Sequence, residues 1–167
     1  MLPNSVVSKT NAYLGLGAAV LMAITVAVTL GFQHIGGYIP CKLCLEQRMP
    51  YYVGAPLMLL GFVLWQFGAH ANFVRACFII GALIMAYSIY LGVFHAGVEW
   101  AFWAGPADCS ITVAAPTTTN ILDAIDTIKP PSCTEAALRV LGLSFAGWNV
   151  IASFGLATLA GRAALSK

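Results

Sequence analysis

Charged side chains are scarce in this sequence. Only 8% of its 167 residues are Asp, Glu, Lys or Arg, whereas a soluble domain carries roughly 25%. Hydrophobic residues make up 60% of the chain, and this composition argues against a water-soluble fold. The formal net charge is only +2, so nothing indicates nucleic-acid binding. Internal repeats and long low-complexity segments are also absent, which favours a single integral membrane domain over residues 1–167.

Four stretches lack all of these charged residues and are long enough to cross about 30 Å of hydrocarbon as helices. They run from Ala12 to Phe32, Met49 to Phe67, Ala76 to Val98, and Val140 to Gly161. The first is longer than the roughly 7–15 apolar residues of a signal peptide, so we expect it to be retained as a helix. The sequence therefore predicts an all-α membrane protein built as a four-transmembrane-helix bundle. Three residues should kink or thin its second helix without abolishing it: Gly54, Pro56 and Gly61.

Four spans place both termini on one side of the membrane and two loops, at about residues 33–48 and 99–139, on the other. Each side carries four Lys or Arg residues, but the terminal-side segments are shorter, and their higher density of positive charge favours the cytoplasm. Four of the five cysteines fall in the opposite loops, as expected of a compartment where disulfides persist. We therefore predict a multi-pass protein of the bacterial inner membrane, with cytoplasmic termini and periplasmic loops.

The motif Cys41-Lys42-Leu43-Cys44 lies between Pro40 and the second predicted span. A disulfide within a CxxC closes a very small ring and removes little entropy from the unfolded chain, so a structural role gains little from this spacing. The spacing suits redox cycling, in which a thiolate is the nucleophile. On one continuous helix, Arg48 would place a guanidinium beside Cys44 and lower the pKa of that thiol. An Arg at a helix end can equally extend its charge to the lipid headgroups.

Cys109 and Cys133 form a second candidate pair, with 23 residues between them. A disulfide there could be a structural staple, contributing ~3 kcal/mol through loop closure. Alternatively, two dithiol pairs on one membrane face indicate a relay, because thiolate attack moves a disulfide from one pair to the next. A four-cysteine zinc site is disfavoured, since such sites usually take closely spaced pairs and only one CxxC is present, so we predict no metal. Cys77 lies within a span and should behave as a small hydrophobe.

The long loop begins with aromatic residues typical of a membrane interface: Trp100, Phe102 and Trp103. Further on, Asn120 can cap a short amphipathic helix. The isoleucines on one face of that helix are Ile121, Ile125 and Ile128. We expect this helix to lie on the membrane surface, and packing against the protein itself is the alternative. Pro130 and Pro131 end the helix, which leaves Cys133 on a non-helical segment.

Several local sequences resemble the disulfide bond formation protein B (DsbB) family. They are Phe32-Gln33-His34, Pro40-Cys41-Lys42-Leu43-Cys44, Gln47-Arg48, His95-Ala96-Gly97-Val98-Glu99 and Ser144-Phe145-Ala146-Gly147-Trp148-Asn149. With the four spans and the two later loop cysteines, the resemblance covers nearly the whole chain. It implies a membrane protein-dithiol:quinone oxidoreductase that reoxidises a periplasmic DsbA-like protein of thioredoxin fold and passes the electrons to ubiquinone or menaquinone.

The resemblance also implies a role for each cysteine in the two loops. Cys109 forms the mixed disulfide with the DsbA-like partner, and Cys133 is its partner within the chain. Cys41 then receives the exchange and Cys44 contacts the quinone. Arg48 helps to bind or polarise that quinone.

Two histidines lie near the outer membrane surface, where imidazole can hydrogen-bond a quinone carbonyl or transfer a proton. His95 is the better candidate, and His34 the weaker. Glu46 and Gln47 are interpreted as polar interface residues and not as catalysts. We expect a monomer. Two other functions remain open from the sequence: a thiol relay that runs in the reducing direction, and a membrane scaffold with structural disulfides.

Overall fold

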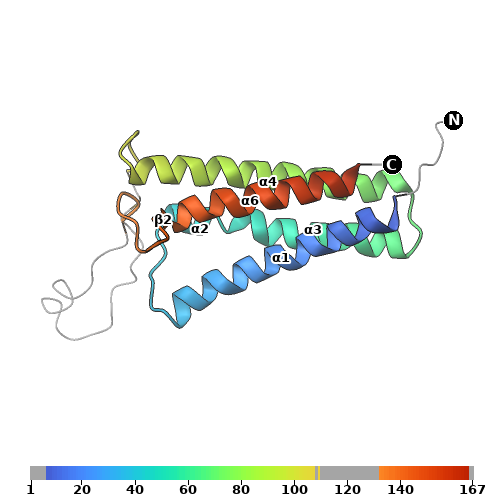
Figure 1. Cartoon of the computed structure of the whole chain (residues 1–167), viewed down its shortest axis with the longest axis horizontal. Helices are drawn as coiled ribbons and strands as arrows, with labels where there is room; N and C mark the ends of the chain where they lie inside the picture. The colour runs from blue at the N-terminus through green and yellow to red at the C-terminus, as the bar shows by residue number, and fades with distance from the viewer. Residues whose placement is uncertain (1–6, 108, 110–131, 166–167) are drawn as a thin grey trace, which may run out of the picture.

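The protein is a helical bundle. The computed structural model describes residues 7–107, 109 and 132–165. Its long helices are α1 (Lys9–His34), α3 (Met49–Gln66), α4 (Ala71–Glu99) and α6 (Phe145–Ala164), which pack lengthwise against one another (Figure 1). The short helix α2 (Lys42–Glu46) precedes α3, and the strands β1 (Arg139–Val140) and β2 (Leu143–Ser144) form a hairpin ahead of α6. The amphipathic helix predicted from Asn120 lies outside the described residues.

The two ends of the bundle carry different parts of the chain. At one end, the start of α1 meets the end of α6, where the Asn11 side chain donates a hydrogen bond to the Leu165 carbonyl. The indole of Trp65, near the end of α3, donates to the Val7 carbonyl at the same end. The CxxC segment and the β-hairpin lie at the opposite end (Figure 1). The long helices therefore run alternately up and down the bundle (Figure 1).

Within the described part of the chain, two helices are long and apolar enough to cross a membrane. These are α1, with 26 residues, and α4, with 29 residues. Large apolar side chains remain exposed along both, among them Ile24, Val28, Ile80 and Leu83. In a membrane such side chains face lipid and need no protein cover. The two helices support a membrane protein, while the arrangement with four spans stays a prediction.

Close packing between helices depends on glycines that face bulky side chains. The fully buried Phe78 of α4 lies between Gly15 of α1 and Gly61 of α3, where an added Cβ would approach its ring to 2.5 Å and 2.6 Å. Met58 of α3 meets Gly81 of α4 in the same way. Small residues let helix backbones approach closely, which favours helix association within lipid.

A buried polar network ties α3, α4 and α6 together below the CxxC end. The Tyr51 hydroxyl donates to the Asn149 side-chain oxygen over 2.6 Å and lies 2.9 Å from the Ser153 hydroxyl. Ser153 in turn donates to the Ser88 hydroxyl over 2.8 Å. Polar groups in an apolar bundle need internal partners, and these residues supply one another. The network fixes how the three helices sit around the cavity described below.

The start of α6 differs from the predicted range. That range begins at Val140, whereas the helix begins at Phe145. Leu141 and Gly142 adopt φ values of 52° and 84°, the conformation of a two-residue hairpin turn, which no helix accommodates. Ser144 then caps the helix with its hydroxyl. The apolar residues before Ser144 therefore belong to the β-hairpin and not to the helix.

The other boundaries lie closer to prediction. The helix α3 continues from Met49 to Gln66 through Pro56, so the expected kink residues do not end it. The helix α4 begins at Ala71, earlier than the predicted Ala76, because the His70 side chain accepts a hydrogen bond from the Asn72 backbone and caps it. Its charged residue Arg75 consequently lies inside the helix and not in the preceding connection.

Candidate functional site

The CxxC motif is held at the N-terminus of α2. Cys41 has extended backbone angles after Pro40 and is the N-cap residue, and its sulfur accepts a hydrogen bond from the Cys44 backbone N–H over 3.2 Å. The Cys41 and Cys44 sulfurs are 2.6 Å apart and both thiols are free. A disulfide has a sulfur–sulfur distance of about 2.05 Å, so the pair needs only a small movement to close one.

The two thiols of the motif differ in acidity. The pKa of Cys41 is lowered to about 5 because it accepts a hydrogen bond from the Cys44 thiol and is stabilised by His95, which together outweigh its burial. The pKa of Cys44 is raised, chiefly because its proton is shared with the Cys41 sulfur and because its thiol is buried. At neutral pH the reduced pair therefore holds a thiolate on Cys41 and a proton on Cys44.

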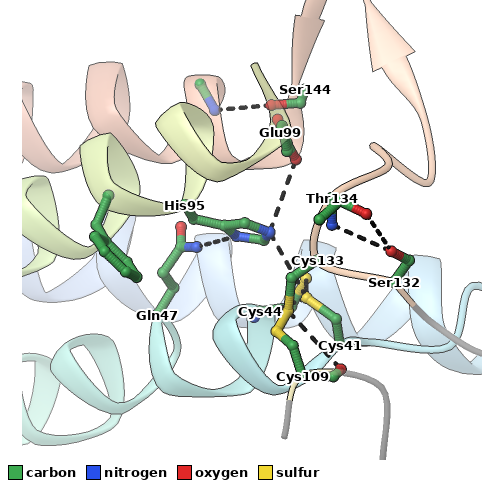
Figure 2. Close-up of polar contacts among 12 residues, drawn as sticks. Cys41, Cys44, Gln47, His95, Glu99, Cys109, Ser132, Cys133, Thr134 and Ser144 are labelled. Atoms are coloured by element: carbon green, nitrogen blue, oxygen red, sulfur yellow. Dashed lines mark hydrogen bonds and ion pairs between the residues drawn. A yellow bond between two sulfur atoms is a disulfide. The ribbon is translucent and has the colours of Figure 1, made fainter. Parts of the chain in front are cut away.

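The second cysteine pair lies against the first. Cys109 and Cys133 form a disulfide with a Cα–Cα distance of 5.9 Å. The Cys133 sulfur, the Cys41 sulfur and a ring nitrogen of His95 all lie within 4.8 Å of one another. Figure 2 shows the four loop sulfurs gathered beside the end of α4. Leu43 packs into the same buried cluster. Thiolate attack on a disulfide needs such proximity, so the folded chain can support exchange between the pairs.

These grouped atoms also include types that bind metals. Cys41, His95 and Cys133 offer two sulfurs and an imidazole nitrogen at mutual distances that a cation could bridge. In this oxidation state, however, Cys133 is bonded to Cys109 and is not a thiolate. Zinc binds the thiolate form of cysteine, so the grouping is better explained by sulfur exchange.

A cavity of about 110 Å³ opens beside the CxxC motif among α1, α3 and α6. Its wall is largely apolar, and its polar lining groups include Gln33, Gln47, Arg48, Tyr51, His95 and Asn149. Cys44 lines the cavity, whereas Cys41 is not among its lining residues. Small-molecule sites commonly combine apolar walls with a few placed polar groups, and those for drug-sized ligands measure roughly 300–1,000 Å³. The smaller volume here suits a single ring and not an extended ligand.

The Arg48 guanidinium is held at this cavity by α1. It donates to the Gln33 side-chain oxygen over 2.5 Å and approaches the Thr29 carbonyl at 3.5 Å. The condition of one continuous helix from Cys44 to Arg48 is not met, because α2 ends at Glu46 and Arg48 is the N-cap residue of α3. The pKa of Cys44 is accordingly raised and not lowered. Arg48 thus shares the cavity with Cys44, through a different local structure from the one expected.

His95 lies at the junction between the cavity and the cysteines. It is only 3% exposed, and its Nε2 is 3.8 Å from the Cys41 sulfur. Its Nδ1 is 2.6 Å from the Gln47 side-chain nitrogen, and its Nε2 is 3.8 Å from a Glu99 carboxylate oxygen (Figure 2). From the sequence, Gln47 was expected only as a polar interface residue, and no role was predicted for Glu99. The contact between Glu99 and His95 could have been predicted from the sequence, because residues four apart lie on the same face of a helix.

Two other candidates lie apart from this site. His34 is the last residue of α1, is exposed and is not among the residues that line the cavity. Cys77 is a buried free cysteine in α4, where its Cβ lies 3.0 Å from the position that a Cβ on Gly61 would take. This packing agrees with the prediction that Cys77 behaves as a small hydrophobe.

The paired cysteines, the buried cavity and the apolar helices define a membrane protein with the features of a thiol–disulfide oxidoreductase. The chain belongs to the family described as disulfide bond formation protein DsbB, whose model matches residues 10–163. The family and the two apolar helices together indicate an inner-membrane protein that acts in disulfide-bond formation.

One curated relative is the uncharacterized protein RP370 of Rickettsia prowazekii (strain Madrid E). It is 24% identical over 148 residues, which cover 86% of this chain and 83% of that protein. No solved structure gives a significant match. The family assignment therefore rests on the family model and agrees with the sequence resemblance.

Proposed function

We propose that the protein is a protein-dithiol:quinone oxidoreductase that reoxidises a periplasmic DsbA-like protein of thioredoxin fold. The position of Cys41 is the observation that carries this proposal. Its sulfur lies within 4.8 Å of the Cys133 sulfur and 2.6 Å from the Cys44 sulfur. Cys44 in turn lines the cavity. Electrons therefore have an ordered route from the long loop, through Cys41 and Cys44, to an acceptor beside Arg48.

The route consists of four thiol–disulfide exchanges. A thiolate of the reduced partner attacks Cys109, which forms a mixed disulfide and releases Cys133 as a thiolate. Cys133 attacks Cys41 and displaces Cys44. The partner's second cysteine releases Cys109, and Cys109 then attacks Cys133 and frees Cys41. The partner leaves oxidised, the loop disulfide is restored, and the two electrons reside on the Cys41–Cys44 dithiol.

The closeness of the two pairs favours a relay over a scaffold. Two purely structural disulfides need no approach between them, whereas the Cys133 and Cys41 sulfurs lie within 4.8 Å of each other.

The cavity residues fit a quinone ring. A quinone supplies an acceptor for two electrons and two protons, and its carbonyl oxygens accept hydrogen bonds. Arg48 and Asn149 present donor groups among the lining residues, and the volume of about 110 Å³ suits one ring. Cys44 shares the same wall and is the sulfur closest to such a ring.

The proposed orientation places the CxxC end of the bundle toward the periplasm. Both termini then lie on the cytoplasmic side, since the start of α1 and the end of α6 meet at the opposite end (Figure 1). A soluble partner reaches Cys109 from the periplasm, and a quinone reaches the cavity from the bilayer. The two substrates therefore meet the protein in different phases and react through the sulfur relay.

A pair of double variants tests the relay geometry. The Cys44→Ser/Cys109→Ser protein keeps Cys41 and Cys133, which should form a disulfide readily on mild oxidation because their sulfurs lie within 4.8 Å. The matched Cys41→Ser/Cys109→Ser protein keeps Cys44 and Cys133 and should form its disulfide at least about tenfold more slowly, because Cys44 is directed toward the cavity. Peptide mass spectrometry identifies each bond. Equal rates in the two proteins would contradict the assigned order.

A further inference from the structure

The carboxylate of Glu99 is buried, which costs free energy if the group is charged. Its side chain is 4% exposed, and one oxygen lies 3.8 Å from His95 Nε2. The other oxygen is buried and has no hydrogen-bond partner within the described part of the chain. A buried carboxylate is expensive unless an opposite charge compensates it. His95 is the ionisable group placed to do so.

The His95 ring connects this carboxylate to the redox-active sulfur. Its Nε2 is equally far, 3.8 Å, from the Cys41 sulfur and from the Glu99 oxygen. The ring is held from its other side by Gln47, whose side chain is itself only 7% exposed. A nucleophilic sulfur, a base and a group that orients the base are therefore present in one buried cluster (Figure 2).

Gln47 can hold the ring in either protonation state. Its amide nitrogen, 2.6 Å from Nδ1, donates to a neutral His95 ring. After the amide rotates, its oxygen can accept from the N–H of an imidazolium. Gln47 therefore fixes the orientation of His95 without deciding its charge. The charge is set by the groups on the Nε2 side, Cys41 and Glu99.

We propose that Glu99 is a positioning residue whose carboxylate stabilises the His95 imidazolium in both redox states, and that this cation keeps the sulfur of reduced Cys41 a thiolate. The Nε2–H of the imidazolium faces the Cys41 sulfur and the Glu99 carboxylate, and no electrons move between these residues. The proton stays at a residue that also lines the cavity. The inference deepens the proposed function, because it concerns the same dithiol.

His95 is a basic group in direct contact with the Cys41 sulfur. Cys44 keeps its proton, because its pKa is raised by the Cys41 sulfur and by burial, with a smaller contribution from Glu99. Cys133 does not titrate while bonded. Arg48 is turned toward Gln33 on α1. The lowered pKa of Cys41, to which His95 contributes through a hydrogen bond and through charge, agrees with this arrangement.

The pH dependence of Cys41 alkylation tests the inference. Reduced, quinone-free protein is alkylated at a series of pH values, and mass spectrometry follows Cys41 separately from the other thiols. In Glu99→Gln we expect the pKa of Cys41 to rise by about one unit and alkylation on the acidic side to slow about tenfold. The matched control Glu46→Gln, which makes the same change in α2, should titrate as the native protein does.

A second variant separates an electrostatic role from a loss of structure. If Glu99 acts through His95, Glu99→Gln should have no further effect on the Cys41 titration in a His95→Asn background. An unchanged pKa of Cys41 in Glu99→Gln, or a lowered one, would overturn the inference, as would full additivity of the two substitutions. Because neither quinone nor partner is present, the result does not depend on whether the protein reduces quinone.

Discussion

The reduction potential of the Cys41–Cys44 pair should depend on pH differently from that of an ordinary dithiol. The pKa of Cys41 is lowered to about 5, while that of Cys44 is raised. Between these two values, reducing the disulfide takes up two electrons and only one proton, because Cys41 remains ionised. Since a tenfold change in equilibrium constant equals about 30 mV for a two-electron couple, the potential should fall by about 30 mV per pH unit.

The same shift sets the potential at neutral pH. Relative to an ordinary value of 9.0, a pKa of about 5 stabilises the reduced form at pH 7 roughly a hundredfold, which corresponds to about 60 mV. The raised pKa of Cys44 adds nothing there, because that thiol is protonated at pH 7 in either case. The Cys41–Cys44 disulfide should therefore be a stronger oxidant than an unperturbed pair, as the oxidation of a DsbA-like protein requires.

The measurement uses quinone-free protein equilibrated in glutathione buffers between about pH 6 and pH 8.5. The thiols are then trapped by alkylation and quantified by mass spectrometry. After correction for glutathione, the account predicts a slope near 30 mV per pH unit for Cys41–Cys44. In His95→Asn the Cys41 thiolate loses part of its stabilisation, so the pKa of Cys41 should rise. The potential should then change more steeply with pH at the acidic end of this range than it does in the native protein. A slope of about 60 mV per pH unit throughout would mean that both thiols are protonated, and would refute the reasoning.

Three substitutions, two of them with a control variant, test other parts of the account. Cys41→Ser should abolish thiol-dependent quinone reduction and Cys77→Ala should leave it near the native rate; retained activity in the first would break the proposed route. Arg48→Ala should raise the KM for quinone about tenfold, because a charged donor is lost, and an unchanged KM would return Arg48 to a lipid contact. Gly61→Ala should lower the free energy of unfolding by about 1–3 kcal/mol through overpacking. The control Gly155→Ala, with open space around it, should not, and equal melting temperatures in detergent would contradict the packing.

The sequence was informative where chemistry follows from local spacing. The charge-free runs predicted the long helices, because a helix must satisfy its own backbone in lipid. The motif from Cys41 to Cys44 predicted a redox pair for the same local reason. The hairpin ahead of α6 was missed, because an apolar run contains no signal for the positive φ of Leu141. Gly142 and Ser144, a turn residue and a capping residue, were the available clues.

The surroundings of Cys41 depend on tertiary structure and could be predicted only in part. His95 and Glu99 are four residues apart on α4, so their shared face follows from helix geometry. Gln47 reaches His95 from a segment 48 residues away, and no local pattern records that contact. The approach of Cys133 to Cys41 likewise joins segments that are far apart in the sequence. The spacing of Cys109 and Cys133 in the sequence was compatible with both a structural disulfide and a redox relay.

Electron transfer from a protein dithiol to quinone is the central claim, and anaerobic mixing tests it most directly. Oxidised protein is mixed with a reduced thioredoxin-fold partner and quinone, while quinone absorbance and partner thiols are followed together. The account predicts one quinone reduced for each partner dithiol oxidised, with turnover lost in Cys109→Ser. Oxidation of the partner without loss of quinone absorbance, or an undiminished rate in Cys109→Ser, would contradict it.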